Sequence, residues 1–237
     1  ARPLCSTLSM VAAARLLPCR LAVASNGIPT AHAKLVAIVL HAHPMMGGCA
    51  DGHVERQLAQ SAAERGVPAF RLAFRGTTVG GQQSAGTRSG DLSEAVEDVV
   101  ACLGDVVEKQ QKVVLMGYSF GSMTALHLLA TMQEERIVGC LLVAPPLSML
   151  PEVTRTDEAR QRYALVKSMA TVVGDHDDLV LGPYRGDVSR YDEQLRTTLG
   201  LPEEKHLKTT LRGVNHFFSN GVEELDSVAR ELLNCVL

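Results

Sequence analysis

Aromatic residues are scarce in this chain of 237 amino acids, which has no tryptophan, four tyrosines and five phenylalanines. Surfaces that stack on nucleobases or sugars are built from such side chains, so the composition argues against both kinds of binding. A basic excess is also lacking: the formal charge is −3, whereas proteins that bind duplex DNA are usually basic. Nucleic acid is therefore not expected as a partner.

Long apolar runs are absent as well. No run approaches the roughly 18 residues that a membrane-spanning helix needs, so no membrane span is expected. Hydrophobic residues make up 46% of the chain and charged residues 21%, which is typical of a globular protein with an aliphatic core. No internal repeat and no linker rich in Pro, Gly and Ser divides the sequence. We expect residues 1–237 to form a single domain.

The six cysteines form no CxxC pair of the kind that binds zinc. A chain of this length buries an adequate core without disulfides, so we expect reduced, mostly buried cysteines and a cytoplasmic location. The N-terminus indicates an alternative, because no acidic residue precedes Asp51, and Arg2, Arg15 and Arg20 lie among Ala, Ser and Leu. That composition is typical of a mitochondrial or other organellar transit peptide. The other interpretation is that residues 1–34 supply the first strands of the fold.

Strand-like and helix-like segments alternate along the chain. Apolar segments rich in β-branched residues predict strands at residues 35–41, 68–74, 112–116, 137–143, 169–173 and 207–211. Periodic or glycine-capped segments predict helices at residues 51–66, 91–109, 122–132 and 221–237. This alternation favours an α/β fold with a mostly parallel central sheet and helices on both faces. Ligands of such sheets bind beyond the carboxyl ends of the strands.

The segment Gly117-Tyr118-Ser119-Phe120-Gly121 has the pattern G-x-S-x-G between a predicted strand and a predicted helix. In that context a sharp turn exposes the serine Oγ at the helix N-terminus, and glycines on either side let the backbone approach closely. We therefore interpret Ser119 as a candidate nucleophile. The alternative is a glycine-rich turn with an incidental serine.

A nucleophilic serine needs a histidine as base and an acid that orients the histidine. His216 lies in the loop before the last predicted helix, which is where the base follows in folds of this kind. Three acids follow the strand at 169–173, namely Asp175, Asp177 and Asp178. The residues alone do not choose among these three carboxylates.

Two backbone N–H groups are expected to stabilise the oxyanion that forms on a substrate carbonyl. One belongs to Phe120, directly after the serine, and the other to Met45 in the loop after the first predicted strand, because Pro44 has no N–H. The same loop holds His41 and His43, which raise the question of a metal site. Histidines that shape the loop beneath the site explain this pair better, so no metal and no cofactor are expected.

Six segments stand in order along most of the chain: HAHPMMGG (41–48), FRLAFRGTTVGG (70–81), GYSFGS (117–122), VAPP (143–146), GDHDDLV (174–180) and NHFF (215–218). Together they resemble the motifs of small, lidless serine hydrolases with the α/β-hydrolase fold, related to dienelactone hydrolase. The resemblance implies that fold, without a large cap domain, and two strands ahead of the segment at 41–48. It also implies that the acid belongs to a G-x-x-D pattern, which aligns Gly174 with Asp177.

The sequence thus predicts a serine hydrolase that cleaves ester or thioester bonds of small acyl substrates through an acyl-enzyme intermediate. A non-catalytic scaffold or binding subunit of the same fold is the first alternative, because folds do not determine functions. A serine peptidase is the second, but the segment at 146–169 is too short for a large cap that selects peptides. A small-molecule ester or thioester is the expected partner, and a homodimer is left open. A short acyl group is expected, because the apolar walls near the serine are few: Met45, Met46, Phe120, Phe217 and Phe218.

Overall fold

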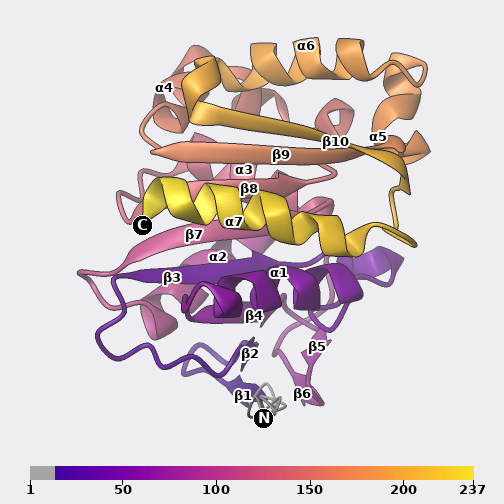
Figure 1. Ribbon diagram of the computed structural model, residues 1–237. Helices are drawn as coiled ribbons and strands as arrows, with labels where there is room; N and C mark the ends of the chain where they lie inside the picture. The colour runs from indigo at the N-terminus through magenta and orange to yellow at the C-terminus, as the bar shows by residue number, and fades with distance from the viewer. Residues whose placement is uncertain (1–13) are drawn as a thin grey trace, which may run out of the picture.

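The apolar segments of the sequence pair into one eight-stranded sheet in the computed structural model, which describes residues 14–237 (Figure 1). The strand order is β1-β2-β4-β3-β7-β8-β9-β10. Neighbours from β4 to β10 pair in parallel, whereas β2 is antiparallel to both β1 and β4. The strands are β1 (Ala14–Leu16), β2 (Ala22–Ser25), β3 (Leu35–Leu40), β4 (Ala69–Ala73), β7 (Lys112–Tyr118), β8 (Ile137–Val143), β9 (Ser168–His176) and β10 (His206–Asn215). A separate hairpin contains β5 (Thr78–Val79) and β6 (Gln82–Gln83).

Helices cover both faces of this sheet. In Figure 1, α1 and α7 lie together in front of the strands, and α2 and α3 lie behind them. The helices are α1 (His53–Glu64), α2 (Leu92–Val106), α3 (Phe120–Thr131), α4 (Asp157–Tyr163), α5 (Asp178–Leu181), α6 (Val188–Leu199) and α7 (Leu225–Val236). A layer of helices on each face is what parallel connections between strands require, so the predicted fold class is confirmed.

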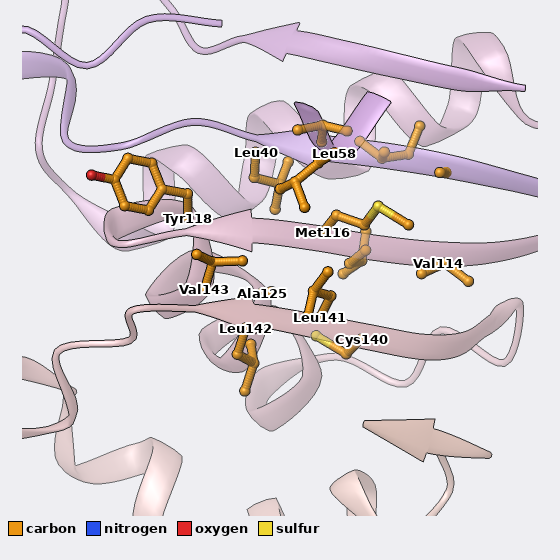
Figure 2. Packing of buried hydrophobic residues seen from close by; sticks show 14 of the residues in the cluster. Leu40, Leu58, Val114, Met116, Tyr118, Ala125, Cys140, Leu141, Leu142 and Val143 are labelled. Carbon is orange, nitrogen blue, oxygen red and sulfur yellow. The ribbon is translucent and has the colours of Figure 1, made fainter. Parts of the chain in front are cut away.

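The core lies between the sheet and the two helical layers. All six residues of β3 are buried, as expected for a parallel strand that is covered on both faces. Figure 2 shows part of this core, with side chains from β3, β7 and β8 and with Leu58 of α1. Each fully buried aliphatic side chain contributes roughly 1.5–3 kcal/mol relative to exposure. The packing therefore holds the carboxyl ends of the central strands in fixed relative positions.

Every predicted strand and helix is present, but several ends differ from the prediction. β7 continues to Tyr118 and β9 continues to His176, because pairing with neighbouring strands extends beyond the apolar runs. β10 likewise continues past an irregularity to Asn215. The last helix begins at Leu225 and not at Gly221, because Gly221 has a φ of 76° and a 3-10 turn follows it.

Three helices were not predicted from the sequence. α4 lies between β8 and β9, and α5 and α6 lie between β9 and β10. α6 is capped by Asp187 and ends at Gly200, yet most of its residues are polar and few are buried: Tyr191, Leu195, Thr198 and Leu199. Its apolar periodicity is therefore weak in the sequence. None of these inserted segments amounts to a large cap domain.

The first strands precede the segment at 41–48, as the family resemblance implies. Arg15 belongs to β1, and β2 pairs with β4. Of the three arginines behind the transit-peptide interpretation, Arg15 and Arg20 belong to the described chain, whereas Arg2 lies outside the described residues. Between residues 14 and 237, no helix combines the length and the hydropathy that crossing a membrane requires.

The cysteines that the structure describes carry free thiols. Cys102 and Cys140 are buried, as predicted, whereas Cys19 and Cys49 are half-buried and Cys235 is exposed. The expectation of mostly buried cysteines therefore holds only for two of the five described. Cys5 lies outside the described range.

Candidate active site

Four parallel strands end at one edge of the sheet and carry the candidate residues there. β7 leads into Ser119, β9 into Asp177 and β10 into His216, while β3 leads into the loop at 41–48. Because the carboxyl ends of parallel strands share an edge, the fold brings together residues that are distant in the chain. Ser119 and His216, for example, are 97 positions apart.

The turn around Ser119 has the geometry that the G-x-S-x-G pattern predicts. Ser119 has φ 52° and ψ −110°, which is a strained conformation for a residue with a side chain. A Cβ atom on Gly117 would lie 2.4 Å from the carbonyl carbon of Gly121. A Cβ atom on Gly121 would lie 2.2 Å from the carbonyl oxygen of Leu40. Both glycines are therefore needed for the turn to pack between β7, α3 and β3.

The turn is also held by hydrogen bonds to neighbouring strands. The Ser119 N–H donates to the Val143 carbonyl at 2.8 Å, and the Ser122 hydroxyl donates to the Gly117 carbonyl at 2.7 Å. The Phe120 N–H, at the start of α3, has no acceptor among residues 14–237. It is a free donor at the positive end of the helix dipole, where negative charge is stabilised.

Ser119, His216 and Asp177 form a continuous chain of hydrogen bonds. The Nδ1 atom of His216 donates to Oδ2 of Asp177 at 2.8 Å, and the Ser119 hydroxyl lies 3.0 Å from Nε2. The carboxylate accepts, so the neutral imidazole has its proton on Nδ1 and offers Nε2 as the acceptor for the serine proton. All three side chains are buried, and Asp177 is fully so.

The structure distinguishes among the three candidate acids, of which Asp175 lies near the end of β9 and Asp177 and Asp178 follow that strand. Asp177 contacts His216 through Oδ2, and its Oδ1 accepts from the Val180 N–H at 2.9 Å. Asp175 instead accepts from the Gly213 N–H at 2.6 Å, and Asp178 begins α5. Asp177 is thus the acid that lies against the histidine.

Two side chains, those of Tyr118 and His53, hold the loop that contains His216 through hydrogen bonds. The Tyr118 hydroxyl donates to the His216 carbonyl at 2.7 Å. The Nε2 atom of His53 lies 2.9 Å from the Phe217 carbonyl and 3.1 Å from that of Phe218, and donates to both. Sequence reasoning missed these two supports, because each joins segments that are distant in the chain and no local pattern marks them.

The loop after β3 differs in detail from the prediction. The Met45 N–H donates to Nδ1 of His43 at 3.2 Å, and the Met45 side chain is largely exposed. The His43 N–H, by contrast, has no acceptor in the described part of the chain. The His43 ring packs edge-on against the Phe120 ring, with 4.9 Å between the ring centres. The ring of His43 therefore lies beside the start of α3.

His41 is buried beneath this loop. Its Nδ1 atom donates to the Ala42 carbonyl at 2.6 Å, and its Nε2 atom accepts from the Phe74 N–H at 3.3 Å. Burial lowers the pKa of His41 to about 4, so the ring stays neutral near pH 7. These bonds agree with a role in shaping the loop. Across residues 14–237, no three His, Cys, Asp or Glu side chains converge as metal ligands would.

A cavity of about 320 Å³ opens beside Ser119 and His216. His43 lines it, whereas Met45 does not. Of the five apolar walls expected from the sequence, Met46 and Phe217 line the cavity and Leu179 joins them. Phe120 and Phe218 belong to the buried core instead. The volume lies at the low end for small-molecule sites.

Glu55 places a carboxyl group on the wall of this cavity, and the sequence did not single it out. It is 2% exposed, and its Oε1 accepts from the Ala42 N–H at 3.1 Å. Burial raises the pKa of Glu55 to about 7, against the opposing effects of nearby N–H groups and of the charges of His53 and Arg71. Ser119, the candidate nucleophile, and the Glu55 carboxyl group lie on the wall of the same cavity.

A family model described as the alpha/beta hydrolase family matches residues 37–228. The chain belongs to the alpha/beta hydrolase family. The match covers β3 to α7 and so includes Ser119, Asp177 and His216.

Solved structures of other alpha/beta hydrolases are similar over nearly the whole chain. A protein of unknown function from Agrobacterium tumefaciens, described as a candidate alpha/beta hydrolase, is 26% identical with a TM-score of 0.69, and the similarity covers 94% of each chain. A Xanthomonas campestris serine hydrolase described as lacking a lid is 23% identical with a TM-score of 0.73, covering 100% of this chain and 98% of that one. Dienelactone hydrolase from Anabaena variabilis is 17% identical with a TM-score of 0.63, covering 94% and 95%. The Xanthomonas and Anabaena structures are less than 25% identical to this chain, so their similarity shows a shared fold.

Proposed function

We propose that this alpha/beta hydrolase is a serine hydrolase that cleaves ester or thioester bonds of small acyl substrates. The observation that carries the proposal is the buried chain of hydrogen bonds from Ser119 through His216 to Asp177, beside a cavity. A serine, a histidine and a carboxylate in this order form the machinery of acyl transfer on several unrelated folds. Membership of a hydrolase family supports the same reaction class.

In the first half of the reaction, Ser119 Oγ attacks the carbonyl carbon of the substrate and His216 Nε2 takes the serine proton. The bond between carbon and the leaving oxygen or sulfur then breaks, and His216 returns the proton to the leaving group. Asp177 keeps the Nδ1 proton in place and stabilises the imidazolium that forms. Water repeats the sequence on the acyl-enzyme, which releases the acid and restores Ser119.

The negative charge on the carbonyl oxygen needs hydrogen-bond donors that are already in position. We assign the first to the Phe120 N–H, which is free at the start of α3. For the second we favour the His43 N–H over that of Met45, which the sequence predicts. The Met45 N–H is already engaged by His43 Nδ1, whereas His43 lines the cavity and its amide has no acceptor within residues 14–237.

A fluorophosphonate probe tests this function directly, because it reacts only with an activated serine. We expect labelling of the wild-type protein at Ser119 and hydrolysis of p-nitrophenyl butyrate. Ser119→Ala should abolish both, with a loss on the order of 10⁶ in kcat. The matched control Ser219→Ala, at an exposed serine near the same site, should label and hydrolyse normally. An unlabelled wild-type protein, or activity that persists in Ser119→Ala, would favour the non-catalytic scaffold or another nucleophile.

A further inference from the structure

The wall of the cavity beside Ser119 includes the carboxyl group of Glu55, a residue that is only 2% exposed. Glu55 extends from the first turn of α1, and its Oε1 accepts from the Ala42 N–H. No hydrogen bond from another residue between 14 and 237 reaches Oε2, and Oε2 is not among the fully enclosed side-chain atoms without a partner in this range. It therefore faces the cavity, where a ligand can hydrogen bond to it.

The absence of a side chain at Gly52 leaves space beside Oε2 of Glu55. A Cβ atom on Gly52 would lie 2.0 Å from Glu55 Oε2, so any other residue at this position would press on the carboxyl group. Gly52 has φ −58° and ψ 155°, a conformation that other residues adopt readily, so the backbone does not by itself require glycine here. Gly52 and Glu55 both line the cavity that contains Ser119.

The charges around Glu55 indicate what kind of group it accepts. His53 and Arg71 lie near enough to favour the carboxylate form, and His53 lines the same cavity, so a cationic ligand would compete with these side chains for the carboxylate. A hydroxyl group carries no charge and both donates and accepts hydrogen bonds. It can therefore pair with the carboxyl group whether Glu55 is protonated or ionised.

We propose that Glu55 binds a hydroxyl group of the substrate, so that the cavity selects hydroxyl-bearing esters over unsubstituted ones. This inference rests on the proposed hydrolase function and names its substrate class. A site that hydrogen bonds a substrate hydroxyl discriminates strongly against the analogue without it, because the buried polar group is then left without a partner. An apolar pocket of the same shape discriminates far less.

The test compares two pairs of esters that differ by one hydroxyl. Methyl 3-hydroxybutyrate against methyl butyrate places the hydroxyl in the acyl half, and 2-hydroxyethyl butyrate against propyl butyrate places it in the alcohol half. In the wild-type enzyme we expect kcat/KM to favour the hydroxyl-bearing ester of one pair by at least about tenfold. Glu55→Met should reduce that preference to near unity. Glu64→Met, at the exposed end of the same helix, is the matched control and should retain it.

A second variant keeps the test decisive if Glu55→Met does not fold. Gly52→Ala leaves Glu55 in the chain but displaces its Oε2, which lies 2.0 Å from the position of the added Cβ atom, and should lose the same preference. If Glu55 served only to hold the Ala42 N–H, its removal would lower kcat for all four esters alike and leave both ratios unchanged. Unchanged ratios in Glu55→Met and Gly52→Ala, or a wild-type enzyme without preference in either pair, overturn the inference. A wild-type protein that hydrolyses none of the esters and resists the fluorophosphonate probe refutes the proposed function, and this inference with it.

Discussion

The hydroxyl of Tyr118 donates a 2.7 Å hydrogen bond to the backbone carbonyl of His216, which is 98 positions later in the chain. Tyr118 is the last residue of β7 and immediately precedes Ser119. Its side chain therefore links the loop that contains His216 to the strand that leads into Ser119. The Tyr118 ring also packs against the rings of His216 and Phe218. The distance between the two catalytic candidates thus depends on a residue that takes no part in the proton transfers.

Tyr118→Phe should therefore weaken both stability and turnover. The substitution removes the donor and leaves the buried His216 carbonyl without it, which costs about 1–3 kcal/mol. We expect a lower melting temperature and a lower kcat, with KM changed less. Tyr184→Phe is the matched control, because the Tyr184 hydroxyl is half-buried and forms no hydrogen bond within the described range. Equal kcat values for the two variants would show that the bond does not position His216.

Asp177→Asn should lower kcat by roughly 10⁴, because an amide at this position favours the wrong tautomer of His216. Asp178→Asn should lose far less, since Asp178 begins α5 and does not contact the histidine. Asp175→Asn should also keep most activity, because an amide oxygen can still accept from the Gly213 N–H. Steady-state kinetics with p-nitrophenyl butyrate measures all three. An inactive Asp175→Asn enzyme beside an active Asp177→Asn enzyme would refute the assignment of the acid.

Two Gly→Ala substitutions should have opposite effects on stability. Gly121→Ala places a methyl group against the Leu40 backbone, where nothing flexible can yield, and should destabilise by about 3 kcal/mol or more. Gly104→Ala lies within α2 with nothing within 4 Å of the new methyl group, and should stabilise by about 0.5–1 kcal/mol. Urea unfolding midpoints give both values. A stable Gly121→Ala protein would mean that the turn tolerates a wider approach between α3 and β3.

Short acyl chains should be the better substrates. The cavity of about 320 Å³ has Met46, Leu179 and Phe217 as its large apolar walls, and the described segments between strands include no large cap to extend it. Each additional CH₂ gains about 0.8 kcal/mol only where a wall buries it. p-Nitrophenyl acetate and butyrate should therefore be hydrolysed with higher kcat/KM than the decanoate or palmitate. A steady rise from the acetate to the palmitate would reveal a longer acyl channel.

Glu55 should make stability depend on pH. Its pKa is raised from the ordinary 4.5 to about 7, so the folded protein holds this proton more tightly than the unfolded chain does. Stability is then lost as the pH rises from about 4.5 to 7, by an amount on the order of 3 kcal/mol. Glu55→Gln does not titrate and should escape this loss. The melting temperature of Glu55→Gln minus that of the wild type should therefore be larger at pH 8 than at pH 5, and a constant difference would contradict the shift.

Local patterns in the sequence sufficed for the candidate nucleophile and base. The glycines around Ser119, the strand before it and the helix after it are adjacent in the chain, so short-range sterics determine the turn. His216 follows from chain order in the same way. The choice of Asp177 among three acids needed the family resemblance, because neighbouring carboxylates look alike until the fold places one against the imidazole.

Other parts of the site depend on contacts that chain order does not reveal. The sequence predicts Met45 as the donor because Pro44 has no N–H, whereas in the structure the Met45 N–H donates to His43 and the His43 amide has no acceptor among the described residues. The sequence also predicts Phe120 and Phe218 as walls of the cavity, but their rings pack into the core. The sequence does not predict α6, because most of its residues are polar and the few buried ones give only a weak apolar periodicity.

The sequence by itself determined the alternation of strands and helices, the strained turn at Ser119 and the order of serine, acid and histidine, because periodicity and glycine sterics act over a few neighbouring residues. The tertiary structure then placed Asp177, which the family resemblance implies, against His216, and it alone decided which amides are free and that Glu55 faces the cavity. Those outcomes depend on the register of parallel strands and on the packing of α1 and α3 at the sheet edge. Such contacts join residues that are far apart in the chain, and their geometry exists only once the core has formed.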